Sequence, residues 1–136
     1  MGLRLLAADE RKTLDLGGTL FHVRKIPHGV LVYLNRKNTA RGRVDLDGLE
    51  RDLWVRCLAG WENLSDARGE PIPSEPERPT EWTDPETGDK FTHPLAFVVA
   101  MGLPQGVADL LLAEAKGLEA KVHDALGNSS RSSASA

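Results

Sequence analysis

The chain has 136 residues, of which 40% are apolar and 27% charged, and its formal net charge is -3. Such a length and composition are typical of one soluble globular domain with a single modest core. Basic and acidic residues are interspersed, which argues against a nucleic-acid partner. No stretch approaches the roughly 18 apolar residues of a membrane span, and the N-terminal apolar run is too short for a signal peptide. We therefore expect a cytoplasmic protein with no membrane partner.

The first part of the chain is predicted to form a small antiparallel sheet. Within residues 3–26, two short runs with strand character are separated by Gly17 and Gly18, a pair that favours a tight hairpin turn. Phe21 and Val23 alternate with more polar side chains, as they do in a strand with one buried face. We expect this face to pack on the helix that follows.

An amphipathic helix is predicted from residue 46 to a buried anchor at Trp61, with Gly60 close to its end. The side chains that share one helical face are Leu46, Leu49, Leu53, Trp54, Cys57, Leu58 and Trp61. Asp45 or Asp47 is placed to cap the first free amide groups. Cys57 is the single cysteine, and its place on the apolar face indicates a small buried side chain rather than a reactive thiol.

A stiff turn is predicted after the tryptophan. Asp66 can accept a hydrogen bond from the backbone two residues further on, and Gly69 can supply a positive φ. Pro71 and Pro73 disfavour both a helix and a central strand. The helix is therefore expected to leave through a fixed exit.

The run from Val55 through Gly60 and Trp61 to Pro73 resembles the phage tail assembly chaperones of long-tailed, siphovirus-type bacteriophages. In that family an apolar helix ends in Gly-Trp and an acidic turn ends in Pro-Ile-Pro. The resemblance extends more weakly to the strand at residues 21–27 and to the closing helix with its polar tail. The Pro-rich segment after Pro73 departs from the family pattern.

The resemblance implies a non-enzymatic chaperone that binds the tape-measure protein, keeps it from aggregating and recruits tail-tube subunits during tail morphogenesis. Such proteins act in the host cytoplasm and are absent from the mature virion. A longer product made by ribosomal frameshifting near the C-terminus is common in the family. Whether such a product exists here, and whether the chain forms a homo-oligomer, stays open.

Two segments before the helix are less regular. Residues 30–34 are a solid apolar run, for which composition favours a strand and the resemblance favours a helix. We expect a helix. Residues 35–42 are basic and polar, which is typical of a solvated connection rather than a phosphate site.

A Pro-rich arm is expected over residues 74–94. The stretch from Pro71 to Pro94 contains six prolines, these two included, so an exposed and mostly irregular segment is predicted. Trp82 and Phe91 interrupt it and suggest a small hairpin. An aromatic side chain in such an arm usually ties it to the core, and less often serves as an anchor for a partner.

A long helix closes the predicted domain. Leu95–Met101 is a short apolar segment, and Pro104 opens a helix whose apolar face continues to Leu126. The small polar residues 129–136 have nothing to bury and are predicted to be a disordered tail. The expected fold is thus a single α+β domain over residues 1–128: a small N-terminal antiparallel sheet packed on helices, a Pro-rich arm and a long C-terminal helix.

The sequence contains no recognisable catalytic or metal-binding pattern. Its four histidines lie in four separate segments, and the Asp45–Gly48 run lacks the glycine and carboxylate spacing of a calcium loop. We expect no cofactor, no metal and no enzymatic activity. The residues expected to form a partner-binding surface are Trp82, Phe91, Leu111, Leu118 and Val122. The alternatives are a structural virion component, such as a tail-completion or connector subunit, and a small enzyme or metal-binding domain.

Overall fold

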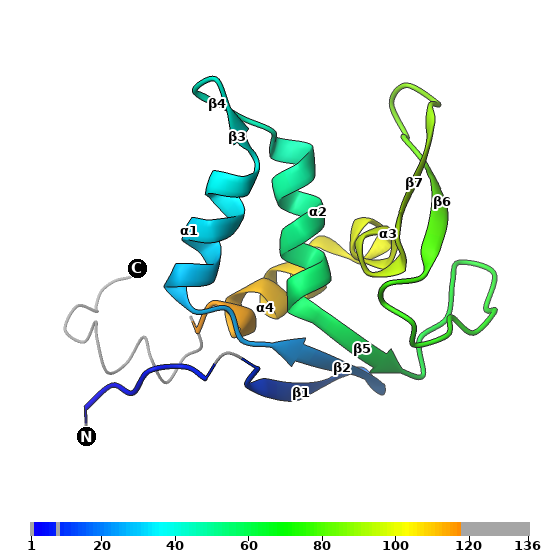
Figure 1. The fold of residues 1–136 in the computed structure, drawn as a ribbon. Coiled ribbons are helices and arrows are strands. Elements are labelled where there is room, and N and C mark those ends of the chain that lie inside the picture. The colour runs from blue at the N-terminus through cyan, green and yellow to red at the C-terminus, as the bar shows by residue number, and fades with distance from the viewer. Residues whose placement is uncertain (1, 8, 118–136) are drawn as a thin grey trace.

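The computed structural model describes residues 2–7 and 9–117 of the chain, and these form seven strands and four helices (Figure 1). The mixture of small antiparallel sheets and helices confirms the expected α+β class. No helix in the described part is long and apolar enough to cross a membrane. The expected tail at 129–136 lies outside the described residues.

The largest sheet has three antiparallel strands in the order β1-β2-β5. They are β1 (Arg11–Leu16), β2 (Thr19–Arg24) and β5 (Leu58–Glu62). Gly17 and Gly18 have φ angles of 67° and 94°, so this pair forms the predicted tight turn between β1 and β2. Figure 1 shows the sheet at one end of the molecule, with α1 and α2 standing on it.

The expectation that the central helix continues to Trp61 is wrong. Helix α2 (Leu46–Cys57) ends at Cys57, and the chain enters β5 at once. In β5, Leu58 pairs with Val23 and Trp61 with Phe21, with a register shift between these two pairs. One extra residue on β5 forms a bulge there, so Leu58 and Trp61 share a face although they are three residues apart.

This bulge explains why the sequence looked helical. In a regular strand, positions three apart lie on opposite faces, whereas on a helix they lie on the same face. Because of the bulge, the buried residues of β5 have the three-residue spacing of a helical face. The segment is nevertheless a strand, because it pairs with β2. A Cβ at Gly60 would lie 2.9 Å from the Ser74 hydroxyl and would displace this group, which accepts a hydrogen bond from the Trp61 amide.

The expected contact between the sheet and α2 is confirmed. Phe21 and Val23 are buried and belong to one core with Trp54, Cys57 and Trp61. Burial raises the pKa of the Cys57 thiol to about 12, so this cysteine is a small core side chain and not a thiolate.

Helix α1 (His28–Lys37) contains the apolar run 30–34, which is therefore helical as expected. The basic segment 35–42 is not a loop throughout, since its first three residues complete α1. Strands β3 (Thr39–Ala40) and β4 (Arg43–Val44) follow as a tight hairpin. Its turn needs positive φ angles, which Arg41 and Gly42 adopt at 54° and 76°.

Asp52 joins the end of α1 to α2. Its carboxylate accepts a hydrogen bond of 3.0 Å from Asn38 Nδ2 and lies 3.2 Å from Lys37 Nζ. Burial alone would raise the pKa of Asp52, but the hydrogen bonds from Asn38 and Lys37 outweigh it and hold the pKa below its ordinary value of 3.8. The ionised carboxylate therefore stabilises the packing of α1 on α2.

Replacing Asp52 with Asn should lower the free energy of unfolding by about 1–2 kcal/mol at pH 7, because hydrogen bonds to a charged group are lost. A lowered folded pKa stabilises the protein above the unfolded pKa and ceases to do so as the pH falls through the folded value. The deficit of the variant should thus shrink below pH 3.8. Urea unfolding at several pH values measures it, with the exposed Glu70→Gln as control; a deficit independent of pH would contradict the assignment.

The Pro-rich arm is more regular than expected. From Pro79 to its end the arm forms a hairpin of β6 (Pro79–Thr83) and β7 (Lys90–Pro94), in agreement with the small hairpin suggested by its aromatic residues. At the turn, Asp84 Oδ1 accepts a hydrogen bond of 2.8 Å from the Glu86 amide, and Gly88 has a φ of 78°. The hairpin thus has its own turn chemistry.

Two helices follow the hairpin. Helix α3 (Leu95–Gly102) is the short apolar segment and is largely buried. Helix α4 (Gln105–Ala115) begins directly after Pro104, as expected, and Gly117 beyond its end has a φ of 77°. The expectation of one unbroken helix from Pro104 to Leu126 is wrong, because α4 ends at Ala115 and Gly117 adopts a positive φ that an α-helix does not allow. Residues 118–126 lie outside the described part of the chain.

Candidate partner-binding groove

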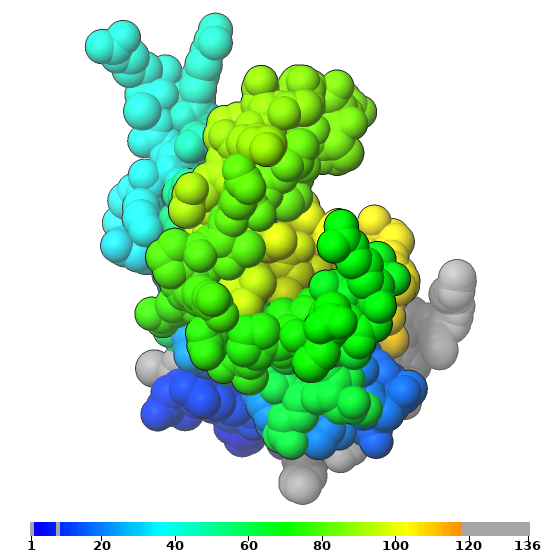
Figure 2. Space-filling model, turned by 90° about the vertical axis from the view of Figure 1, so that its right-hand side faces the viewer, coloured from blue at the N-terminus to red at the C-terminus, as the bar shows by residue number. Residues whose placement is uncertain are grey.

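A groove of about 540 Å³ lies between the N-terminal half of α2, the β6–β7 hairpin and α3. Figure 1 shows the hairpin standing beside α2, with α3 at the base between them. In the view of Figure 2 the hairpin projects as a separate lobe beyond α3. The lining side chains are Asp45, Leu46, Asp47, Glu50, Arg51, Trp82, Asp84, Phe91, His93, Phe97 and Met101, together with Gly48.

Aromatic rings form the wall of the groove on the hairpin side. Trp82 and Phe91 are cross-strand partners with ring centroids 6.3 Å apart. Trp82 also meets Phe97 of α3 edge to face at 5.6 Å, and the His93 ring lies 4.5 Å from Phe97. Because Phe97 is buried, these contacts fix the hairpin to the core.

The histidine in this cluster is held in its neutral form. Burial lowers the pKa of His93, and the positive charge of Arg51 lowers it further. The shift is downward from an ordinary value of 6.5, so the ring is mainly uncharged at neutral pH. His93 therefore extends the aromatic wall without adding a positive charge to the groove.

Carboxylates dominate the rim. They are Asp45, Asp47 and Glu50 of α2 and Asp84 of the β6–β7 turn. Arg51 is the single lysine or arginine among the lining residues, and its Nε lies 3.4 Å from the carboxylate of Asp52. The groove thus combines an aromatic wall with a rim of net negative charge.

Several rim carboxylates are fixed by the local structure. Asp45 caps α2, accepting a hydrogen bond of 3.1 Å from the Gly48 amide, as one of the two capping alternatives predicted. Glu50 accepts a hydrogen bond of 3.1 Å from Trp54 Nε1. The negative charge is therefore held at defined positions rather than on freely rotating side chains.

The predicted partner-binding residues do not all meet. Trp82 and Phe91 line the groove, with Trp82 half-buried and Phe91 46% exposed. Leu111 is fully buried, and its carbonyl lies 3.8 Å from Cys57 Sγ in the core, so it offers no surface to a partner. Leu118 and Val122 lie outside the described residues.

Sequence reasoning missed Asp47, His93 and Met101 as groove residues. A partial signal was present for His93, which lies two residues after Phe91 and hence on the same face of a strand. Asp47 and Met101 carried no such signal, because they come from the start of α2 and the end of α3. Only the packing of these helices against the hairpin brings them together.

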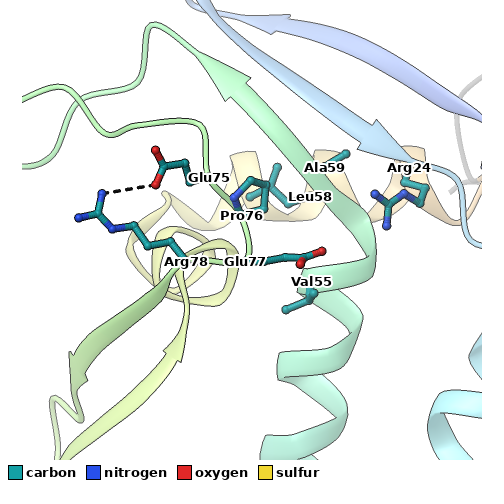
Figure 3. A pocket seen from close by; sticks show the side chains of 8 residues that line it. All are labelled: Arg24, Val55, Leu58, Ala59, Glu75, Pro76, Glu77 and Arg78. Carbon is teal, nitrogen blue, oxygen red and sulfur yellow. Dashed lines mark ion pairs between the residues drawn. The ribbon is translucent and has the colours of Figure 1, made fainter.

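A second pocket of about 480 Å³ lies where α2 passes into β5 (Figure 3). Its charged side chains are Arg24, Glu75, Glu77 and Arg78, and an ion pair of 3.5 Å joins Arg78 to Glu75. Burial lowers the pKa of Arg24. Two cations and two anions balance each other here, so this pocket has no charge preference comparable to that of the groove.

Within the described residues, no group of three or more His, Cys, Asp or Glu side chains is placed to hold a metal ion. Comparisons of the chain with protein-family models, with curated proteins and with solved structures find no match.

Proposed function

We propose that this protein is a non-enzymatic phage tail assembly chaperone, which binds the tape-measure protein and recruits tail-tube subunits during tail morphogenesis. The observation that carries the proposal is the run from Gly60 to Pro73, which resembles this family. Its place of action would be the host cytoplasm, and it would be absent from the mature virion.

The conformation of this run supports the proposal, because its characteristic residues have defined local roles. The Trp61 amide donates to the Ser74 hydroxyl at 2.9 Å, and Trp61 Nε1 donates to the Ile72 carbonyl at 3.0 Å. Asp66 accepts a hydrogen bond of 2.8 Å from the Arg68 amide, and Gly69 has a φ of 87°. The run thus forms one unit held by its own local hydrogen bonds.

The groove supports the binding part of the proposal. A chaperone for a long apolar client needs exposed apolar surface that is held in place and does not collapse into its own core. Phe91 meets this requirement, since it is exposed on a hairpin that Trp82 and Phe97 fix to the core. Each client side chain fully buried there would contribute about 1.5–3 kcal/mol.

Co-expression with the tape-measure protein of the same phage genome tests the function. We expect this chain to increase the soluble fraction of the tape-measure protein and to co-purify with it. Phe91→Ala should reduce both effects. Tyr33→Ala is the matched control, because Tyr33 is a 60% exposed aromatic residue of α1 and does not line the groove.

If the tape-measure protein is equally insoluble with and without this chain, and neither co-purifies with the other, the chaperone function is wrong. Mass spectrometry of purified phage particles distinguishes a chaperone from the main alternative, a structural virion component. Stoichiometric amounts of this chain in finished particles would identify a structural virion component, whereas absence from them agrees with a chaperone.

A further inference from the structure

We infer that the groove between α2 and the β6–β7 hairpin binds a basic amphipathic helix, with apolar side chains on the aromatic wall and Lys or Arg opposite the acidic rim. This inference rests on the proposed function in taking the occupant to be a segment of a client protein. It goes further by stating the chemistry of that segment.

The first step concerns the apolar surface. Phe91, Met101 and Leu46 all line the groove and are 46%, 38% and 72% exposed. They come from β7, α3 and α2, respectively, so this surface is created by the packing of three elements. A partner side chain that enters the groove is therefore contacted on several sides, as it is in a binding pocket.

The second step concerns charge. Four carboxylates line the groove against one guanidinium, that of Arg51, which already lies 3.4 Å from Asp52. The N-terminus of α2 adds a partial positive charge at this end, but Asp45 and Asp47 in its first turn outweigh it. His93 does not alter the balance, because its lowered pKa keeps it neutral. A positively charged occupant therefore complements the rim.

The third step concerns the conformation of the occupant. Trp82 and Phe91 are directly opposite each other in the ladder, and His93 follows Phe91 by two residues, so all three lie on one face of the hairpin. The groove thus meets the face of this sheet and not a strand edge. An extended segment would find no backbone ladder to join there, whereas a helix satisfies its own backbone hydrogen bonds.

Fluorescence anisotropy with a labelled Leu/Lys helical peptide of roughly 15 residues, long enough for measurable helicity, tests the inference. Two companion peptides complete the set: one with Glu in place of Lys, and one with Ser in place of Leu. We expect the Leu/Lys peptide to bind roughly tenfold more tightly than either companion, since each lacks one of the two complementary features. Equal binding of the Leu/Glu and Leu/Lys peptides would overturn the inference.

Variants place the binding in the groove. Asp47→Lys should weaken the Leu/Lys peptide roughly tenfold and improve the Leu/Glu peptide, because the sign of one rim charge is reversed. Glu70→Lys makes the same change of net charge on an exposed turn away from the groove and should alter neither affinity. If Glu70→Lys weakens binding as much as Asp47→Lys does, the attraction is non-specific and the inference fails.

The two tests fail separately. The peptide measurement involves no phage protein, and the co-expression experiment involves no designed peptide. If the chain keeps the tape-measure protein soluble but does not bind the Leu/Lys peptide, the chaperone function is supported and the inference about the groove is wrong. If the chain binds the Leu/Lys peptide through Asp47 but has no effect on the tape-measure protein, the inference about the groove is supported and the chaperone function is wrong.

Discussion

Replacing Trp61 with alanine should lower the free energy of unfolding by about 3–5 kcal/mol, the range for truncating a buried tryptophan. The side chain is 1% exposed and belongs to the main hydrophobic core. Because domains of this size are stable by about 5–15 kcal/mol, a loss of this size leaves a marginal protein. Denaturant unfolding followed by circular dichroism measures the change.

Two further variants separate the contributions to this loss. Trp61→Phe keeps most of the apolar volume but removes the Nε1 donor to the Ile72 carbonyl, so a smaller loss of about 1–3 kcal/mol is expected. Tyr33→Ala truncates an exposed aromatic residue and should change stability by less than about 0.5 kcal/mol. A Trp61→Ala protein with an unchanged denaturant midpoint would contradict the assignment of Trp61 to the core.

The burial of Trp61 could be predicted from the sequence, but the element that carries it could not. The apolar spacing from Leu46 to Trp61 fits one helical face, and the structure divides it between α2 and a bulged strand. Both arrangements bury Trp54, Cys57, Leu58 and Trp61, whereas Leu46, which the helical face also included, is 72% exposed. Pairing with β2 decides between them, and periodicity within one segment contains no information about a partner strand.

Local hydrogen-bond chemistry was the most predictable part of the fold. Asp45 caps α2, Asp66 closes its turn, and Gly17 and Gly18 form the hairpin turn, all as their residue types indicated. Each of these interactions spans only a few residues, so the sequence contains both partners. The small hairpin suggested within the arm is also present, and in it Trp82 pairs with Phe91.

The groove depended on packing that no local pattern reveals. The apolar face of the last helix was evident, but its direction was not, and Leu111 faces the core where a partner-binding role had been expected. Conversely, Asp47 was visible only as an alternative helix cap and became a rim residue because the hairpin stands beside α2. Side chains that are separated by tens of residues had to be placed by the tertiary structure.

A buried ion pair fastens α4 to the end of β2. Lys25 and Glu114 are 5% and 6% exposed, and the Lys25 ammonium donates to the Glu114 carboxylate and, at 2.9 Å, to its backbone carbonyl. Beside this pair, the Ile26 amide donates to the Ala115 carbonyl at 2.7 Å. Helix α4, which covers Cys57, is thus attached to the sheet by desolvated charged and polar groups.

Lys25→Met should lower the free energy of unfolding by about 3–5 kcal/mol, because it leaves the Glu114 carboxylate buried without its main cation. Lys12 approaches that carboxylate at 3.6 Å, but it is an exposed lysine and cannot replace a buried one. The double variant Lys25→Met with Glu114→Leu should recover most of the loss, since an apolar pair of similar size needs no counter-charge. Denaturant unfolding of the single and double variants at pH 7 provides the measurement. A loss below about 1 kcal/mol in Lys25→Met, the range of exposed ion pairs, would show that this pair contributes little to the attachment of α4.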